Sequence, residues 1–280
     1  SGAPDSLFPP PPAQLAVPQD AIPSTLPEPG SLVDLLEQST ALVVAVGQGG
    51  TGFGTGFFIS PSLLVTNHHV AAGAGEGGKL FVTSQRLGGL KQGRLLASFG
   101  PLEETGGDFA VIEVQDAPDM PYYVLRDSSA TMKLQNVIAA GYPAVILESD
   151  ANFEALMSGD AAAIPDMVVT QGIVSVEQEI GPQTRVVVHT ASISPGNSGG
   201  PLVDSCGRVV GVNTFGRLEK QTMRRVNFAL DSHDLIDFLK ANSIAFQSSV
   251  QACQPAVNRV AESVSPAGEG APPAPADGEN

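Results

Sequence analysis

The sequence predicts an all-β domain, either a barrel or a sandwich, and three observations support this fold class. Apolar, β-branched runs of 4–7 residues recur along the chain, bounded by Gly, Pro, Asn or Asp. The 280 residues include 31 Gly and 23 Pro, which favour turns over long helices. Aromatic residues make up only 5% and Trp is absent, so the core must consist mainly of Val, Leu, Ile and Ala. Many short strands with few helices are typical of barrels and sandwiches.

The expected elements follow one another closely along the middle of the chain. Residues 31–37 place apolar side chains on one face of a helix, with a serine as the cap. A second amphipathic helix is expected at residues 232–239. Between the two helices, strands are expected at residues 41–46, 56–59, 63–66, 80–83, 109–114, 137–140, 168–170, 172–176, 185–189 and 209–214.

Both ends of the chain differ from the middle in composition. Residues 1–30 include a run of four prolines, which excludes a helix or a central strand and indicates a linker or a disordered arm. Residues 248–280 are rich in Ala, Pro and Gly and are expected to form a disordered tail. One folded domain is therefore expected at residues 31–247.

The charge pattern excludes several classes of partner. The net charge is −15, and no segment forms a basic patch. Polyanions bind through such patches, so neither nucleic acid nor an anionic membrane surface is an expected partner. No apolar run is long enough to insert into a membrane, and no signal-peptide pattern occurs in this segment.

The two cysteines, Cys206 and Cys253, are either free or paired. They are too few for a disulfide scaffold. A bridge between them would tie the C-terminal segment to the turn that follows Ser198. By the chain-entropy relation, closing a loop of that length stabilises a fold by roughly 4 kcal/mol. The sequence leaves both alternatives open, because pairing depends on where the two sulfurs lie.

The strongest chemical signal is the string SPGNSGGPL at residues 194–202. A serine hydroxyl becomes a nucleophile when a base and backbone N–H donors surround it, and flanking glycines let the backbone bend to supply those donors. Ser198 is therefore the candidate nucleophile. Gly196, Asn197 and Ser198 form the candidate oxyanion hole, with the amides of Gly196 and Ser198 as donors. The alternative is a glycine-rich hairpin turn with no chemistry.

Two further motifs supply a candidate base and a candidate carboxylate. The string LLVTNHHV at residues 63–70 ends a strand in two histidines, and the imidazole pKa suits proton transfer near neutral pH. We expect His69 to be the base, because it directly precedes the apolar Val70, and His68 to be a neighbour. Asp108 follows two glycines and precedes an apolar strand, where a carboxylate can orient an imidazole. The alternatives are a structural histidine pair and an aspartate that caps a strand.

In their chain order of His, Asp and Ser, the three motifs resemble those of chymotrypsin-like (trypsin-like) serine proteases, and most of all the protease domain of the Deg/HtrA family. The strings GTGFFI at 54–59, TQGIVS at 170–175 and NFAL at 227–230 add to the resemblance, which covers residues 31–241. It implies a double six-stranded β-barrel with short N-terminal and C-terminal helices. Barrel one would span about residues 38–125, barrel two about 126–230 and the C-terminal helix about 231–241. It also implies protein or peptide substrates, neither a metal nor a cofactor, and a bacterial periplasmic or secreted location.

The sequence departs from the family pattern in several places. No residues remain for a PDZ domain after 241, and no zymogen-type cleavage sequence is present. Residues 144–167 form an insertion with a short helix at 153–157, either a passive surface loop or a lid near the cleft. The loop between residues 176 and 185 is short, which puts in doubt the allosteric relay that it serves in relatives.

The residues expected at the substrate pocket disfavour cleavage after Lys or Arg. Ser192 lies six residues before Ser198, where enzymes with basic specificity carry an acid. The resemblance places Ile193, Phe215 and Gly216 near the same pocket, which implies a small or medium apolar side chain before the scissile bond. His189 is either a determinant of cleavage after Glu or an ordinary strand residue.

Two rival hypotheses accompany that of an active protease. The chain could be an inactive, protease-like scaffold or binding module. It could instead be a latent enzyme whose cleft is covered by residues 1–30 or 144–167. The sequence does not indicate the physiological substrate or the oligomeric state.

Overall fold

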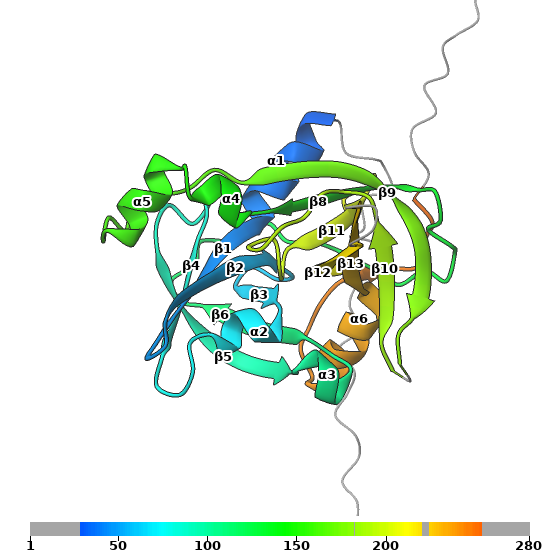
Figure 1. The fold of residues 1–280 in the computed structure, drawn as a ribbon, viewed down its shortest axis with the longest axis horizontal. Helices are drawn as coiled ribbons and strands as arrows, with labels where there is room; N and C mark the ends of the chain where they lie inside the picture. Colours follow the sequence, from blue (N-terminus) through cyan, green and yellow to red (C-terminus); the bar gives the residue numbers. More distant parts are fainter. Residues whose placement is uncertain (1–28, 182, 220–223, 254–280) are drawn as a thin grey trace, which may run out of the picture.

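The computed structural model describes residues 29–181, 183–219 and 224–253. These residues form two closed six-stranded β-barrels that lie side by side, with short helices at their edges (Figure 1). The predicted fold class, a double six-stranded barrel, is confirmed. In the part of the chain that is described, no helix has the length and apolar character needed to cross a bilayer.

Barrel one is built from the first six strands after an N-terminal helix. The helix α1 spans Pro29–Ser39. The strands are β1 (Thr40–Gly47), β2 (Gly50–Phe58), β3 (Leu63–Thr66), β4 (Lys79–Thr83), β5 (Lys91–Phe99) and β6 (Phe109–Val114). They pair antiparallel in the order β1-β2-β3-β6-β5-β4, and β4 returns to β1 to close the barrel. Two short helices, α2 (His68–Ala72) and α3 (Leu102–Thr105), lie in the loops between strands.

Barrel two follows, with a longer helix at its end. Its strands are β8 (Asn136–Gly141), β9 (Val168–Glu179), β10 (Arg185–His189), β11 (Pro201–Asp204), β12 (Val209–Glu219) and β13 (Arg224–Asp231). Pairing of β11 with both β8 and β12 closes the ring. Two short strands, β7 (Leu125–Arg126) and β14 (Ser248–Ser249), extend the sheet beside β12. The helix α6 spans Ser232–Ala241 and is capped by Asp231, which accepts from the His233 amide.

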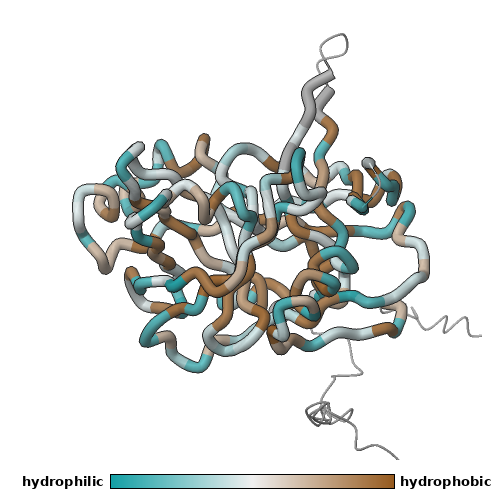
Figure 2. The backbone as a smooth tube through the Cα atoms, turned by 90° about the horizontal axis from the view of Figure 1, so that it is seen from below, coloured by the Kyte–Doolittle hydropathy of each residue, from teal (hydrophilic) through white to brown (hydrophobic). Residues whose placement is uncertain are grey.

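The core is divided by the alternation of side chains along each strand. On β1, Ala41, Val43 and Ala45 point into barrel one, and the residues between them pack outward. A third cluster joins the outer face of barrel one to barrel two and to α6, through residues such as Phe109 and Phe238. Figure 2 shows hydrophobic segments running through the middle of the molecule and hydrophilic segments mainly in the outer loops. This shared interface holds the two barrels together.

The insertion at residues 144–167 covers the outside of barrel one. It contains α4 (Ala144–Leu147) and α5 (Ala151–Met157), and α5 includes the short helix expected at 153–157. Asp150 caps α5, and the Phe153 ring meets Phe53 edge-on at 5.2 Å between centroids. Residues of the insertion also cover the outward side chains of β1, so that this strand is buried on both faces.

The disordered tail was predicted to begin at residue 248, which is too early. Ser248–Ser249 form β14, which pairs in parallel with β7, and Cys253 is joined to Cys206 by a disulfide. These contacts order residues 248–253, although their polar composition resembles that of a tail. The remaining tail residues, 254–280, and nearly all of the predicted arm, residues 1–28, lie outside the described residues.

Candidate active site

The Ser198 segment occupies the connection between β10 and β11, and its shape depends on glycine. Gly196 has a φ of +97°, and a Cβ there would lie 2.3 Å from the Tyr142 carbonyl oxygen. Gly199 has a φ of +85°, and a Cβ there would lie 2.2 Å from the Thr55 carbonyl oxygen. Both the left-handed backbone and the lack of space exclude other residues. The glycines in the string therefore meet a steric requirement of this turn.

Thr55 of barrel one ties this segment to the rest of the fold. Its hydroxyl donates to the Gly196 carbonyl at 2.7 Å and accepts from the Tyr142 amide at 3.0 Å. Its backbone N–H donates to the Ser198 carbonyl at 2.8 Å. The sequence analysis did not identify Thr55 as a site residue. Its position between two glycines on a buried strand was the only available signal.

The amides of the segment divide into occupied and available donors. The Asn197 amide donates to the Ser194 carbonyl at 3.0 Å, so this member of the expected oxyanion hole is already used within the turn. Among the described residues, the amides of Gly196 and Ser198 have no acceptor. The Pro195 carbonyl accepts from the Ala144 amide at 2.7 Å, which directs it toward the insertion. Gly196 and Ser198 are therefore the two donors that remain for an oxyanion.

His69 and Asp108 form a pre-assembled pair in barrel one. Strand β3 ends just before α2, which carries His69, and β3 pairs with β6, which begins just after Asp108. The Nδ1 of His69 lies 2.7 Å from Oδ2 of Asp108, and the His69 amide donates to Oδ1 at 2.9 Å. Because a carboxylate only accepts, this geometry selects the imidazole tautomer with the proton on Nδ1 and leaves Nε2 as a base. His68 instead contacts Ser98, with 2.6 Å between Nδ1 and Oγ.

Ser198 is not hydrogen-bonded to His69 in this structure. Its Oγ donates to the Thr214 carbonyl on β12 at 3.0 Å. Of the three predicted residues, His69 and Asp108 are joined by hydrogen bonds and Ser198 is bonded elsewhere. Catalytic hydrogen bonds in substrate-free enzymes are often long or misaligned and tighten in the complex.

Asn67 links the two halves of the site and was also missed by the sequence analysis. Its Nδ2 donates to the Asp108 carbonyl at 2.7 Å and to Oγ1 of Thr214 at 3.1 Å. Asn67 is fully buried, so both contacts are shielded from water. These two hydrogen bonds connect the backbone of Asp108 in barrel one to β12 of barrel two, whose Thr214 carbonyl accepts from the Ser198 hydroxyl. Neither partner is close to Asn67 in sequence, so no local pattern could reveal the link.

The residues expected at the substrate pocket come from the segment before Ser198 and from β12. Ser192 is exposed, and its carbonyl accepts from Oγ1 of Thr170 at 2.8 Å. Ile193 is buried and packs in the core cluster of barrel two. Phe215 and Gly216 lie on β12, paired with Phe228 and Asn227 of β13.

His189 is a buried strand residue on β10. It is 2% exposed, and neither ring nitrogen makes a hydrogen bond within the described parts of the chain. Burial lowers its pKa to about 4, against weaker opposing effects of the Ala191 backbone and the Asn213 side chain. A neutral buried ring offers no charge to a glutamate side chain, which favours the strand-residue alternative.

The two cysteines do not form a metal site. In the described chain, the only cluster with metal-ligand atoms close together is Asp204, Cys206 and Cys253. The sulfurs are joined in the disulfide, so neither is available as a thiolate. Asp204 is paired with the Arg208 guanidinium, with 2.6 Å between Oδ2 and Nη2.

The comparisons with known proteins agree with this geometry. Residues 54–212 match the profile of the trypsin-like peptidase domain. The chain is 31% identical to the serine protease Do-like HtrB of Bacillus subtilis, over 61% of this chain and 33% of that protein. It is 33% identical to a probable periplasmic serine endoprotease, DegP-like, of Hahella chejuensis, over 66% of this chain and 34% of that protein. The chain thus spans about a third of the length of these relatives.

A solved structure supports the fold. The active form of the Rv3671c protease from M. tuberculosis superposes with a TM-score of 0.59 at 21% identity. The match covers 90% of this chain and 99% of that one. At this level of identity the likeness bears on the fold alone.

Proposed function

The chain belongs to the trypsin-like peptidase family, and we propose that it is a serine endopeptidase of the Deg/HtrA type. Ser198 is the nucleophile, His69 the general base and acid, and Asp108 the carboxylate that orients the base. The observation that carries this proposal is the paired hydrogen bonding of Asp108 to the ring and the amide of His69. A carboxylate that only capped a strand would have no reason to bond both the ring and the backbone amide of one histidine.

The proposed reaction passes through an acyl-enzyme. Rotation of the Ser198 side chain moves Oγ from the Thr214 carbonyl toward Nε2 of His69, which takes the proton as Oγ attacks the peptide carbonyl. The amides of Gly196 and Ser198 then stabilise the developing oxyanion. His69 returns the proton to the leaving amine, and water repeats the sequence to release the acid. Asp108 stabilises the imidazolium at each stage while remaining ionised.

We expect the preferred substrates to carry a small or medium apolar residue before the scissile bond. Ser192 offers no negative charge to a basic side chain, and the exposed position leaves it free to contact the substrate. A peptide library cleaved mainly after Lys or Arg would contradict this expectation.

The proposed location is the bacterial periplasm or the exterior. The disulfide between Cys206 and Cys253 is typical of oxidising compartments, and one of the relatives is named as periplasmic. Disulfide formation in protein isolated without reductant would support this location. Free thiols at both positions would argue against it.

A latent state of the enzyme is the second candidate. The bond from Ser198 Oγ to the Thr214 carbonyl supports it, because it holds the nucleophile away from the base. In that case the chain would hydrolyse peptides only after a partner or substrate releases the hydroxyl.

Labelling with a fluorophosphonate probe, followed by mass mapping, tests the proposal. Labelling confined to Ser198 and lost in Ser198→Ala is the expected result, and Ser194→Ala is the matched control that should label like the wild type. Slow labelling that rises with added peptide substrate would favour the latent enzyme. Folded protein that never reacts would contradict both candidates and support a scaffold role.

A further inference from the structure

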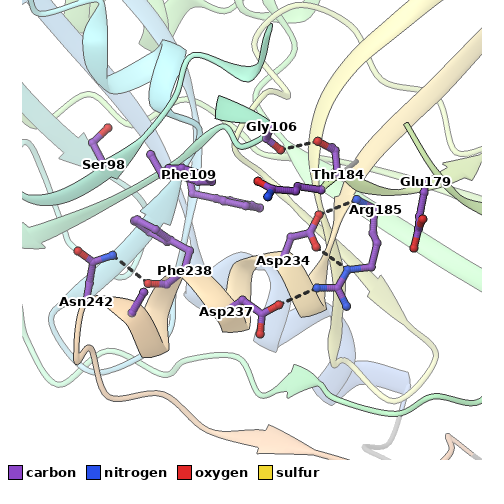
Figure 3. Close-up of a pocket in the computed structure, with 13 residues that line it drawn as sticks. Ser98, Gly106, Phe109, Glu179, Thr184, Arg185, Asp234, Asp237, Phe238 and Asn242 are labelled. Atoms are coloured by element: carbon purple, nitrogen blue, oxygen red, sulfur yellow. Dashed lines mark hydrogen bonds and ion pairs between the residues drawn. The ribbon is translucent and has the colours of Figure 1, made fainter. Parts of the chain in front are cut away.

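A cleft of about 720 Å³ is lined in part by Gly106, from the loop that also carries Asp108 (Figure 3). One wall is aromatic, with Phe99 and Phe109 each stacked near Phe238 of α6. The opposite wall comes from the end of the turn between β9 and β10, where Thr184 points to Gly106 and Arg185 points to α6. The cleft therefore lies where barrel one, barrel two and the C-terminal helix meet.

Thr184 reaches across this junction to the Asp108 loop. Its hydroxyl donates to the Gly106 carbonyl at 2.6 Å, and the residue is only 4% exposed. Gly106 has a φ of +79°. Gly107 lies against the ring of Phe99, where a Cβ would come within 2.1 Å of Cδ1. The two residues before Asp108 thus have little freedom, and one of their anchors belongs to the other barrel.

Helix α6 in turn holds the position of Thr184. The Asp234 carboxylate accepts from the Arg185 amide at 2.7 Å and from Nε of Arg185 at 2.5 Å. Asp237 accepts from Nη2 of the same guanidinium at 2.7 Å, but its side chain is 67% exposed. Because Asp234 bonds the backbone of the residue next to Thr184, it limits movement of the Thr184 hydroxyl directly. The exposed ion pair between Arg185 and Asp237 limits movement of the Thr184 hydroxyl only through the Arg185 side chain.

The other contacts of Asp108 come from barrel one. Asn67 bonds its carbonyl, and His69 bonds its carboxylate. Thr184 contacts this loop directly from barrel two, which also carries Ser198, whereas Asn67 relates Asp108 to barrel two only through Oγ1 of Thr214. A displacement of the carboxylate relative to Ser198 would misalign the imidazole between them, and small misplacements of catalytic groups can cost about 100-fold in rate.

We propose that Thr184 is a positioning residue for Asp108, and that α6 sets its position through Asp234 and Arg185. The inference rests on the proposed function, since it assigns a role in the same triad. It predicts that the rate of the chemical step, and not the affinity for the reactive ligand, depends on the Thr184 hydroxyl.

The test compares variants of the full chain by the kinetics of fluorophosphonate labelling. Thr184→Val should lower the limiting labelling rate about 10-fold and leave the probe's half-saturating concentration unchanged. Thr184→Ser keeps a hydroxyl and should restore most of the rate. Thr131→Val is the matched control, because it removes an exposed threonine hydroxyl bond elsewhere in barrel two, to Glu177. Asp234→Asn should lower the rate about 3-fold, and Asp237→Asn should change it less than 2-fold.

A spectroscopic readout separates this inference from the proposed function. The proton between Nδ1 of His69 and Asp108 should give a downfield NMR resonance in Ser198→Ala, which cannot react. Adding Thr184→Val should shift or broaden that resonance, while Thr184→Ser and Thr131→Val should leave it in place. This readout applies even if the wild type fails to label, which would contradict the proposed function alone.

An unchanged labelling rate and an unchanged resonance in folded Thr184→Val would overturn the inference. So would a change confined to the half-saturating concentration, because it would place Thr184 at the ligand. Should Thr184→Val fail to fold, Asp234→Asn serves as the second variant, and its wild-type behaviour in both readouts would be equally decisive.

Discussion

The two barrels contribute to the candidate site in different ways. Barrel one presents an assembled pair, in which Asp108 already holds the ring and the amide of His69. Barrel two presents Ser198, the proposed nucleophile, whose hydroxyl donates to the Thr214 carbonyl. The acid–base half is therefore pre-organised, and the nucleophilic half depends on one side-chain rotation. Under the proposed function, the His69–Asp108 pair of barrel one must then meet the Ser198 hydroxyl across the interface between the barrels.

The largest expected effect comes from breaking the pair in barrel one. Asp108→Asn keeps the size of the side chain, but its amide group can hold the wrong imidazole tautomer. In a Ser-His-Asp enzyme this change lowers kcat about 10⁴-fold. The measurement is the turnover of a fluorescent casein, with circular dichroism as the control for folding. Retention of more than a tenth of wild-type turnover would mean that Asp108 does not orient the base.

Breaking the backbone of barrel two should have the next largest effect. Gly196→Ala places a Cβ against the Tyr142 carbonyl and strains a left-handed residue. The shift should misplace a donor to the oxyanion, at a cost of up to about 10³-fold in rate. Gly159→Ala is the matched control, because that residue has a φ of +105° but open space around it. Equal turnover in the two variants would show that backbone strain, rather than the oxyanion donors, governs the loss.

The disulfide offers a test of the difference between the two barrels, because both of its cysteines belong to the barrel-two side of the molecule. It joins residues 47 positions apart, and removing such a link should lower the free energy of unfolding by about 4 kcal/mol. Urea unfolding of the wild type, with and without reductant, measures this loss. The double variant Cys206→Ser with Cys253→Ser controls for other effects of the reductant, to which it should be insensitive. A wild type equally stable in both conditions would contradict the expected contribution.

The smallest expected effect concerns His189 and the dependence of stability on pH. Its pKa is lowered to about 4 in the folded chain, below the unfolded value. The stabilisation is therefore complete above about pH 6.5 and is lost as the pH falls toward 4, by roughly 2–3 kcal/mol. His189→Gln should lack this part of the pH dependence in urea unfolding between pH 7 and 4.5, and His68→Gln is the control. Parallel curves for wild type and His189→Gln would contradict a buried neutral ring.

The candidate site could be proposed from the sequence because its three residues lie in short motifs. The glycines around Ser198 meet a steric need of one turn, His69 lies in the short helix that follows β3, and Asp108 directly precedes β6. The residues that were missed act over long separations in the chain. Thr55 meets Gly196 at a separation of 141 residues, and Thr184 meets Gly106 at 78. No local pattern encodes such contacts, since they exist only after the barrels close.

By itself, the sequence determined the fold class and the types of residue that carry the chemistry, because strand propensity, turn glycines and nucleophile motifs are local properties. Only the tertiary structure decided that Ile193 faces the core, that residues 248–253 are ordered, and that Ser198 bonds Thr214 rather than His69. These outcomes depend on side-chain packing and on pairing between distant segments. The contacts that stabilise these arrangements join residues that become neighbours only when the barrels close.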